Sequence, residues 1–445
     1  MIILEHSTYD GDSIGRNLGS AEYSYWFVRK AFRPLLERFG IVIPVSHPER
    51  EADRIYRAAK RYGIPCVLMS FNPPHRTVMG LECPTVPVFA WEFDRIPDEA
   101  WGNEPRNNWA AVLSQLPVAI THSQSSVAAV RNSLGPAYPV WSIPAPVKDG
   151  IFSNVASARG WRDPIFIELN AGVAIDAGGI DLSLFHFTRA NTHGARALRL
   201  LEIAAIRPDR HQRLDLSGVI YSSVFNTADG RKNWTDMVSA FVVAFRDTPD
   251  ATLILKTTHY DITESVLPIL IDLAILGSFK CRVIIIHGLL SDDAYARLIE
   301  ATSFTVNTSH GEGQCLPLME FMAAGRPAVT PHHTAMLDYV SDENAFVVDT
   351  HLRLGFWPHD ARQAKRCMRH EINFADLVRQ YRASYSVAVH EPARYERMVQ
   401  AASKALDAFC SDAVTTTRMA QVMRHLGLAQ QIVPFSQAVP ESRAV

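Results

Sequence analysis

The sequence predicts an α/β protein with two doubly wound parallel sheets and a helical segment at its carboxyl end. Short apolar runs alternate with helical patterns over residues 1–145, and again from Gly218 onward. This alternation is typical of parallel strands joined by helices that cover both faces of a sheet. Between the two regions, residues 146–214 are rich in Gly, Pro, Asp and Arg and show weak periodicity. We therefore predict a connection with an insertion there.

The first half contains five apolar runs that end at turn residues, as buried strands do. These runs are residues 2–5, 41–45, 66–70, 86–91 and 118–121. Helical patterns lie between them, at residues 20–39, 49–62, 106–116 and 123–134. Residues 1–145 are therefore predicted to form one Rossmann-like domain.

The second half repeats this pattern with six further apolar runs. These runs are residues 218–225, 252–257, 282–288, 303–308, 327–331 and 345–349. An amphipathic helix follows the first run at about residues 234–246, and Ser291, before two carboxylates, is a good N-cap for a later helix. The chain beyond Thr350 has helical patterns. We predict a second domain over residues 215–375, helices over 376–427 and a polar tail over 428–445.

Composition excludes several classes of function. The chain has 445 residues, 47% of them hydrophobic, and its net charge of −2 gives no overall attraction to nucleic acid. No apolar run approaches the roughly 18 to 20 residues that span a bilayer, and the first residues lack the pattern of a secretory signal. The six cysteines lie far apart, which indicates free thiols in a reducing compartment. We expect a cytoplasmic protein without nucleic-acid partners.

A Gly-rich loop between a buried strand and a helix is the most informative segment, with the sequence TSHGEGQCLPLME at residues 308–320. Pro317 suits the first turn of a helix, and Gly325 suits the position just after its end. The unpaired amides around Cys315 and Leu316 would point outward at the carboxyl end of the sheet. Open α/β sheets bind anions such as a diphosphate at this place.

Two carboxylates belong to the same segment, Glu312 in the loop and Glu320 in the first helical turn. Held at a fixed separation, they could accept hydrogen bonds from two groups of one ligand, such as a ribose and a sugar. Their spacing alone fits equally well a solvated loop residue and a first-turn carboxylate that the helix dipole stabilises.

A second cluster favours a ligand site. Arg231, Lys232 and Asn233 directly precede the helix that begins near Trp234. Two adjacent cations before a helix N-terminus oppose the helix dipole, unless an anion such as a diphosphate lies between them. The alternative is a solvated turn with ordinary surface cations.

These features resemble the group-1, family-4-like retaining glycosyltransferases of the GT-B fold, in which two Rossmann-like domains face each other across a cleft. The resemblance rests on the loop and helix with Glu312 and Glu320 (the E-x7-E motif), on the Arg231-Lys232-Asn233 turn and on the terminal helices. It is clear over about residues 218–349. It is looser over the first 145 residues, where residues 89–97 and 121–123 fit the family's acceptor domain.

The resemblance implies roles for individual residues. Lys232 and Arg231 would neutralise the departing diphosphate, and Glu312 would hold the donor sugar near its reacting carbon. Glu320 would hold the ribose hydroxyls. The remaining donor-binding positions would be Gly311, Gly313, Gln314, Cys315, Leu316, His287 and Gly288. Many relatives have an Arg where this chain has Asn226, and the sequence leaves open whether Arg231 takes over its role.

The amino-terminal half would supply the acceptor side. Gly19 ends a Gly-rich loop after the first strand, and Glu92 and Asp94 follow an apolar run, where a carboxylate could orient or deprotonate a hydroxyl. His122 lies at the end of the next predicted strand. The alternatives are a flexible loop for Gly19, an ion-pair turn for the carboxylates and a structural role for the histidine.

We therefore predict a glycosyltransferase of the hexosyltransferase type. It would move a sugar from a nucleotide sugar to a glycan or lipid-linked sugar, with retention of anomeric configuration, in cell-surface polysaccharide or related glycan synthesis. A catalytically silent nucleotide-sugar-binding or scaffold protein, and a sugar phosphorylase or epimerase of the same fold, are the alternatives. Because no D-x-D follows a strand and no group of ligand residues is evident, we expect neither a metal nor a cofactor.

Peripheral contact with the cytoplasmic face of a membrane is a further expectation. Basic residues occur on the first long helix and in the middle segment: Arg29, Lys30, Arg33, Arg38, Arg189, Arg196, Arg199, Arg207, Arg210 and Arg213. Either group could bind anionic headgroups. Acidic residues are interleaved with them, which favours the alternative of a solvated face.

Overall fold

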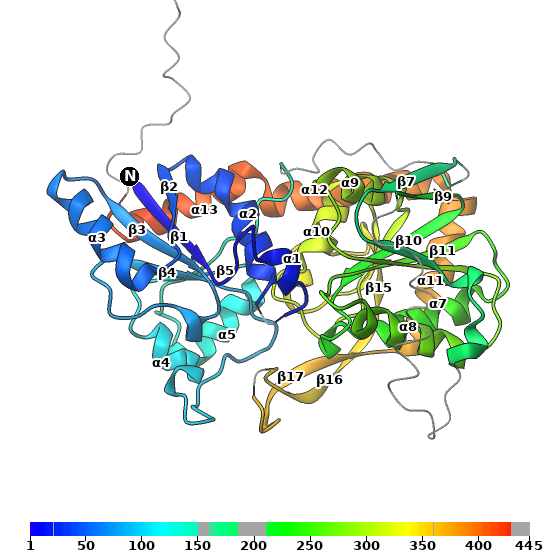
Figure 1. Cartoon of the computed structure of the whole chain (residues 1–445), viewed down its shortest axis with the longest axis horizontal. Helices are drawn as coiled ribbons and strands as arrows, with labels where there is room; N and C mark the ends of the chain where they lie inside the picture. Colours follow the sequence, from blue (N-terminus) through cyan, green and yellow to red (C-terminus); the bar gives the residue numbers. More distant parts are fainter. Residues whose placement is uncertain (21, 150–159, 162, 186–210, 359, 429–445) are drawn as a thin grey trace, which may run out of the picture.

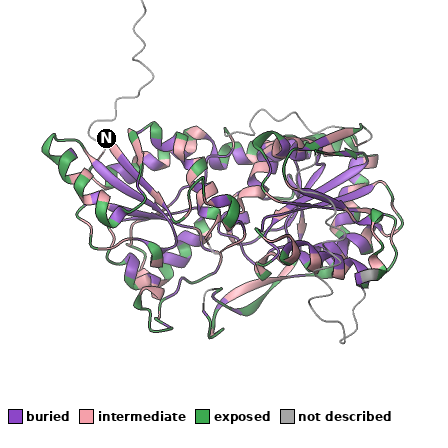
Figure 2. Ribbon diagram, in the orientation of Figure 1, coloured by how far each residue is buried: buried purple, intermediate pink, exposed green. Residues whose placement is uncertain are grey.

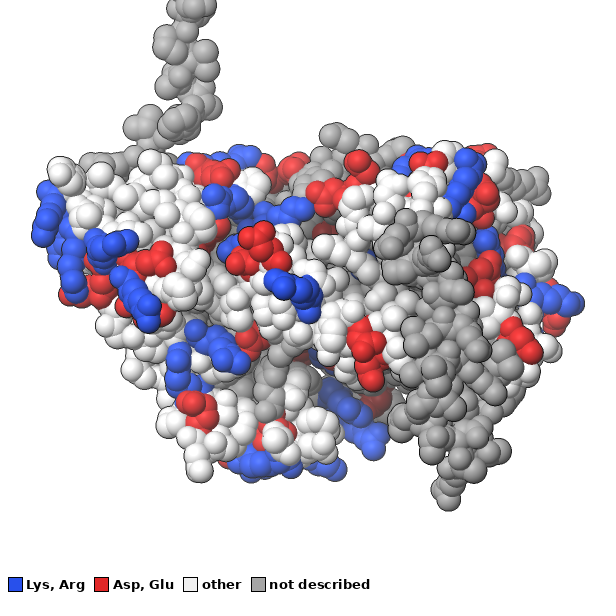
Figure 3. Space-filling model, in the orientation of Figure 1, with Lys and Arg blue, Asp and Glu red and all other residues white. Residues whose placement is uncertain are grey.

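The computed structural model describes residues 1–20, 22–149, 160–161, 163–185, 211–358 and 360–428. Two α/β halves lie side by side in it, and the last helices extend from one half to the other (Figure 1). Buried residues are concentrated in the two sheets and on the helix faces that cover them (Figure 2). On the face drawn in Figure 3, Lys and Arg side chains are interspersed with Asp and Glu.

Six parallel strands form the sheet of the amino-terminal half, in the order β2-β1-β3-β4-β5-β6. They are β1 Ile2–Ser7, β2 Ile41–Pro44, β3 Cys66–Phe71, β4 Thr85–Val88, β5 Ala119–Thr121 and β6 Val140–Ser142. The five predicted strands are confirmed. The sixth, β6, was not predicted, because its sequence, Val-Trp-Ser, forms no continuous apolar run.

Helices pack on both faces of this sheet. They are α1 Ile14–Asn17, α2 Ser24–Glu37, α3 Pro48–Arg61, α4 Trp109–Leu113 and α5 Gln124–Leu134. The pattern predicted over residues 20–39 therefore begins as a helix only at Ser24. The α5 helix begins as expected, because the Ser123 hydroxyl accepts a hydrogen bond of 3.2 Å from the Ser126 amide.

Seven strands form the sheet of the carboxyl-terminal half, in the order β15-β14-β13-β10-β11-β12-β8. They are β8 Val173–Asp176, β10 Val219–Phe225, β11 Ala251–Thr257, β12 Arg282–His287, β13 Phe304–Val306, β14 Ala328–Pro331 and β15 Ala345–Val348. The six predicted strands are confirmed and run parallel. At the edge, β8 pairs with β12 in the antiparallel direction.

Alternate residues of β11 show which helices cover each face of this sheet. Leu253 packs with α7 Trp234–Phe245 and α8 Ile262–Ile275, whereas Ile254 packs with α9 Asp292–Ala301 and α10 Leu316–Ala323. The predicted caps are present. The Ser291 hydroxyl accepts a hydrogen bond of 3.2 Å from the Ala294 amide, and Pro317 lies in the first turn of α10. The helices α9 and α10 thus begin where the sequence indicated.

Two segments contain strands that the sequence pattern did not predict. The weakly periodic middle segment contributes three strands, β7 Ile165–Leu169, β8 and β9 Gln212–Leu216, of which β7 and β9 form an antiparallel pair. After Thr350 the chain forms an antiparallel hairpin, β16 Thr350–Phe356 and β17 Lys365–Ile372, before any helix begins. The β7–β9 and β16–β17 pairs are two-stranded ribbons, whose burial depends on contacts elsewhere in the chain.

Three helices end the described chain: α11 Phe374–His390, α12 Pro392–Cys410 and α13 Asp412–His425. The α11 helix packs in the core of the carboxyl-terminal half, whereas Leu406 of α12 and Met419 of α13 belong to the same core as Phe32 of the amino-terminal half. The chain therefore returns to its first half at its end. Among the helices described here, none is both long and apolar enough to cross a membrane.

Candidate active site

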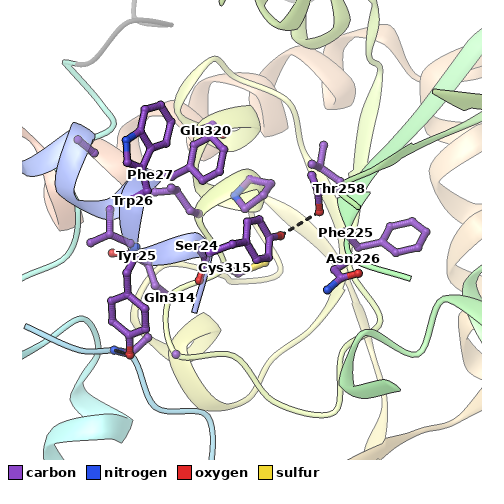
Figure 4. A pocket seen from close by; sticks show the side chains of 18 of the residues that line it. Ser24, Tyr25, Trp26, Phe27, Phe225, Asn226, Thr258, Gln314, Cys315 and Glu320 are labelled. Carbon is purple, nitrogen blue, oxygen red and sulfur yellow. Dashed lines mark hydrogen bonds between the residues drawn. The ribbon is translucent and has the colours of Figure 1, made fainter. Parts of the chain in front are cut away.

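A cavity of about 1000 Å³ lies between the two halves, where the loops after the strands of both sheets meet. In Figure 4, Trp26 and Phe27 of α2 lie on one side of the pocket, and Phe225 and Thr258 lie on the other side. The first turn of α10 forms part of the cavity wall, with Cys315 and Glu320 among the lining residues. This is the place at which the sequence predicted a ligand.

Glu312 is the centre of an ion-pair cluster in this cavity. Lys232 Nζ donates a hydrogen bond of 2.7 Å to Glu312 Oε1, and Arg231 Nη1 donates one of 2.9 Å to Glu312 Oε2. Burial alone would raise the pKa of Glu312, but the two cations outweigh it and lower this pKa to about 2. Glu312 is therefore ionised at any physiological pH, and the structure brings together the three predicted catalytic side chains.

Arg231 has more acidic neighbours than Lys232. Its Nη2 atom lies 2.9 Å from Asp229 Oδ2 and 3.6 Å from Glu92 Oε1, and its Nη1 atom donates a hydrogen bond of 2.6 Å to the Gly311 carbonyl. Together with Glu312, three carboxylates thus surround two cations. The cluster has a net negative charge before any ligand binds.

Left-handed backbone positions precede both helices at this site. Asn233, before α7, has φ 46°, and Cys315, before α10, has φ 60°. Asparagine tolerates this region better than other residues with a side chain, whereas the cysteine is unusual there. The loop is also held by Thr334, whose hydroxyl accepts a hydrogen bond of 3.0 Å from the Glu312 amide. Strained positions of this kind cluster at ligand sites.

The glycines of the loop let it approach the other half of the molecule. A Cβ atom on Gly311 would lie 2.6 Å from the Glu92 carbonyl oxygen, and one on Gly313 would lie 2.7 Å from the Trp91 amide nitrogen. Gln314 continues this contact, because its Oε1 atom accepts a hydrogen bond of 2.7 Å from the Ala145 amide. Gly313 and Gln314 line the cavity, and Gly311 lies behind its wall.

Gly19 makes a similar contact from the amino-terminal half. It has φ +82°, and a Cβ atom there would lie 2.4 Å from His259 Cδ2. Its carbonyl accepts a hydrogen bond of 2.8 Å from Asn226 Nδ2, and nearby the Tyr23 hydroxyl lies 2.9 Å from Thr258 Oγ1. Asn226 thus binds the backbone of the other half, at the position where the family's Arg was expected.

Glu320 lies at the other end of the cavity, beside α9. The Tyr295 hydroxyl donates a hydrogen bond of 2.8 Å to Glu320 Oε2. Burial between α9 and α10 raises the pKa of Glu320 to about 7, although the hydrogen bond from Tyr295 opposes this shift. Because Leu316 of the first turn also lines the cavity, the carboxylate and the free amides of α10 face the same space.

Two residues predicted on the acceptor side lie outside the cavity. Asp94 Oδ1 accepts a hydrogen bond of 2.8 Å from the Met368 amide, so this carboxylate holds the hairpin β16–β17 against the first half. His122 is fully buried, its Nδ1 atom lies 2.9 Å from the Ile143 carbonyl oxygen, and burial lowers its pKa to about 4. Both are structural here. Glu92, by contrast, lines the cavity.

The strand end at His287 and Gly288 also lies behind the cavity wall. His287 Nδ1 lies 3.3 Å from Thr257 Oγ1, and Gly288 packs against Gly172 of the edge strand's turn. The next residues, Leu289 and Leu290, line the cavity instead. In this segment the residues that line the cavity therefore lie one to three positions further along the chain than the predicted ligand-binding residues His287 and Gly288.

Several lining residues were not indicated by the sequence reading: Trp26, Phe27, Lys256 and Tyr295. Lys256 had a local signal, because a lysine interrupts an otherwise apolar strand run at residues 251–257. The aromatic residues had none, since aromatic side chains at helical spacing usually belong to a core. Within the described ranges, no three His, Cys, Asp or Glu side chains are grouped as metal ligands would be. The metal-free site stays a prediction.

Comparison with known proteins shows similarity at the level of structure alone. No protein-family model matches the chain, and no curated protein matches its sequence. Sucrose-phosphate synthase from Thermosynechococcus elongatus is 14% identical with a TM-score of 0.55, and the match covers 96% of this chain and 99% of that one. HepE of Anabaena, in complex with UDP, is 14% identical with a TM-score of 0.52, over 95% and 99% of the two chains.

A glycosyltransferase from Rickettsia africae gives a third match, at 11% identity and a TM-score of 0.51, over 96% of this chain and 98% of that one. The chain has the GT-B fold. The two sheets, the interdomain cavity and the returning helices α12 and α13 are thus those of a GT-B protein. The fold expected from the resemblance is confirmed.

Proposed function

We propose that this GT-B protein is a glycosyltransferase that moves a sugar from a nucleotide-sugar donor to a hydroxyl of an acceptor glycan or lipid-linked sugar. The single observation that carries the proposal is the buried cluster of Glu312 with Lys232 and Arg231, beside the first turn of α10. The similar structures support it, because HepE is described in complex with UDP and also, at a TM-score of 0.50, with UDP-glucose.

Binding of a donor would rearrange the ion pairs of this cluster. Its diphosphate would compete with Glu312 for Lys232 and Arg231, and these cations would stabilise the negative charge that develops on the leaving group. Glu312, released from one or both cations, would accept hydrogen bonds from hydroxyls of the sugar. Glu320 would hold the ribose in the same way. Closure of the two halves around the donor would exclude water from the reacting carbon.

Retention of configuration and the absence of a metal are part of the same proposal. In the proposed complex Glu312 accepts hydrogen bonds from hydroxyls of the sugar, so this carboxylate is assigned to holding the donor and not to covalent attack. A same-face displacement, guided by the departing diphosphate, fits this arrangement. On the acceptor side, burial raises the pKa of Glu92, so this lining carboxylate is suited to take a proton from an attacking hydroxyl. Cell-surface polysaccharide synthesis remains the pathway that we propose.

We also infer that contact with an anionic membrane, where a lipid-linked acceptor would lie, involves the hairpin β16–β17. Three of the four cations that the sequence indicated on the first long helix are held in ion pairs: Lys30 with Asp292, Arg33 with Glu5 and Arg38 with Asp412. In the middle segment, Arg213 pairs with Asp215. The other predicted cations there, Arg189, Arg196, Arg199, Arg207 and Arg210, lie outside the described residues.

The hairpin combines apolar and basic side chains on an exposed ribbon. Leu352 and Leu354 are 58% and 57% exposed, and with Phe356 they follow the alternation of one strand face. Lys365 belongs to the adjoining strand β17 and pairs in register with Phe356, whereas the next residue, Arg366, is held in an ion pair of 2.8 Å with Glu99. Apolar side chains beside cations favour binding to anionic lipid surfaces.

Donor turnover tests the proposed function. The protein is incubated with UDP-glucose, UDP-N-acetylglucosamine, GDP-mannose and ADP-glucose, and released nucleoside diphosphate is measured with and without added sugars. We expect slow hydrolysis of one donor, which an acceptor accelerates. Lys232→Ala and Glu320→Ala should each lower this activity by about 10²–10³-fold. Lys280→Ala removes an exposed cation that pairs with Asp247 and serves as the control.

The alternatives predict different products. An isomerised donor would indicate an epimerase, and release of a sugar phosphate in the presence of inorganic phosphate would indicate a phosphorylase. Nucleotide binding without any turnover would indicate a scaffold protein. Full activity of Lys232→Ala or Glu320→Ala would remove the basis for this donor site.

A further inference from the structure

Lys256, at the carboxyl end of β11, is a buried cation without an acidic partner. The residue is 3% exposed, and its ammonium donates one hydrogen bond, of 3.2 Å, to the carbonyl of the next residue, Thr257. Within the described part of the chain, no carboxylate lies within ion-pair distance of it. Lysines are almost never buried without a partner, because an isolated charge loses its hydration. The position therefore calls for an anion that the protein itself does not supply.

The strand alternation directs this side chain into the cavity. Lys256 is two residues after Ile254, which packs against α9 and α10, so both side chains leave the same face of the sheet. In register, Lys256 lies beside Val224 of β10 and Ile286 of β12. Val224 and Lys256 both line the cavity. Lys256 thus enters the cavity from the carboxyl end of β11, on the sheet face that α9 and α10 cover.

The charges of the cavity show why this amine matters. Four lining residues are Lys or Arg in the described chain: Lys30, Arg231, Lys232 and Lys256. The first pairs with Asp292, and the next two share Glu312, Asp229 and Glu92. Lys256 alone among them has no carboxylate to displace. An anion that enters the cavity therefore gains most from this ammonium and from the unpaired amides of α10.

We propose that Lys256 binds the diphosphate of the donor nucleotide, together with the first turn of α10. The inference rests on the proposed function for the identity of the ligand, and it adds a cation from a second strand to the Arg231-Lys232 turn. It also explains how the site binds a diphosphate although Asn226 is engaged with the Gly19 carbonyl.

The surroundings of Lys256 fit this role. Burial lowers its pKa to about 7, so part of the amine is uncharged in the empty cavity near neutral pH. His287 of the neighbouring strand β12 interacts electrostatically with it, and the same cavity is lined by Tyr295 of α9, Glu320 of α10, the Glu312 cluster with Arg231, Lys232, Asp229 and Glu92, and the pair of Lys30 with Asp292. A bound diphosphate would favour the ammonium form. Binding should then take up a proton from solution.

Calorimetry with graded ligands tests the assignment. Uridine, UMP and UDP, with the guanosine and adenosine series, are titrated into the full chain and into Lys256→Met, Lys256→Arg and the control Lys280→Met. We expect Lys256→Met to weaken binding of the diphosphate by about 10–100-fold, as for loss of a charged hydrogen bond, while nucleoside affinity stays the same. Lys256→Arg should retain most of the affinity. Wild-type binding should take up protons at pH 7.5, and Lys256→Met should not.

The Tm of the variant protein distinguishes a ligand-binding role of Lys256 from a structural one. Because Lys256→Met replaces an unpaired buried amine by an apolar side chain, its Tm without ligand should be equal to or higher than that of the wild type. Unchanged diphosphate affinity in Lys256→Met would overturn the inference and leave the proposed function standing. A lower Tm with parallel losses for nucleoside and diphosphate would also overturn it. A wild-type protein that binds none of these nucleotides would overturn both proposals.

Discussion

Single residues set the pH range of this site. Two lining groups have a pKa near neutrality, Glu320 because burial raises its pKa to about 7 and Lys256 because burial lowers its pKa to about 7. Glu312 stays ionised throughout, since Lys232 and Arg231 outweigh its burial and lower its pKa to about 2. The proposed roles need Glu320 ionised for the ribose and Lys256 charged for the diphosphate.

Affinity for the nucleotide should therefore pass through a maximum near pH 7. As the pH increases toward 7, affinity rises because Glu320 loses its proton, and above pH 7 affinity falls because the Lys256 ammonium loses its proton. Dissociation constants of UDP measured from pH 5.5 to 9 check this expectation. Glu320→Gln should remove the rising limb and Lys256→Arg the falling limb. A profile that is flat over this range, or the same in both variants, would contradict these assignments.

At the scale of elements, the loop before α10 does two things. It presents Glu312 to the cations, and it packs against the end of β4 through glycines that leave no room for a Cβ atom. Such close contact couples the position of Glu312 to the amino-terminal half. The same segment that the sequence indicated as a ligand loop is thus also a joint between the two halves.

Gly313→Ala tests this coupling. The new Cβ atom would lie 2.7 Å from the Trp91 amide nitrogen and 2.8 Å from Ala90 Cβ, so the loop must move away. We expect a loss of about 1–3 kcal/mol in the free energy of unfolding and at least a tenfold lower turnover. Denaturant unfolding and donor hydrolysis measure the two effects. Gly179→Ala is the control, because nothing lies within 4 Å of its Cβ position; equal behaviour of the two variants would be evidence against the coupling.

At the scale of the whole molecule, helices from the end of the chain join the two halves. Met419 of α13 packs in the first core, and Lys148 Nζ donates a hydrogen bond of 2.9 Å to Ser403 Oγ of α12. The hairpin β16–β17 makes a second link, through the hydrogen bond between Met368 and Asp94. Its outer face, however, leaves Leu352 and Leu354 in solvent. That face is available for a membrane.

Vesicle flotation tests this contact. The protein should float with vesicles of phosphatidylcholine and phosphatidylglycerol, bind vesicles of phosphatidylcholine alone more weakly, and dissociate as salt is raised. The double variant Leu352→Ser with Leu354→Ser should reduce the bound fraction by about fivefold or more. The control is Ile275→Ser, which changes another residue that is 70% exposed. Binding that the hairpin variant leaves intact would place the contact elsewhere.

The sequence by itself determined the alternation of strands and helices in both halves, apart from the strands β6 and β8, and the positions of Glu312, Glu320 and the basic turn along the chain. These features depend on periodicity, caps and Gly-rich loops, which are properties of short segments. The resemblance drawn from them led to the GT-B fold, which is confirmed.

Only the tertiary structure decided which of these residues meet. It placed Asp94 and His122 outside the cavity, gave Asn226 to the Gly19 carbonyl and brought Lys256 into the site. It also formed the strands β7, β8 and β9 in the described part of the middle segment and the hairpin strands β16 and β17 after Asp349. The physical reason is the same in each case, because burial, charge pairing and the pairing of ribbon strands depend on atoms from segments far apart in the chain.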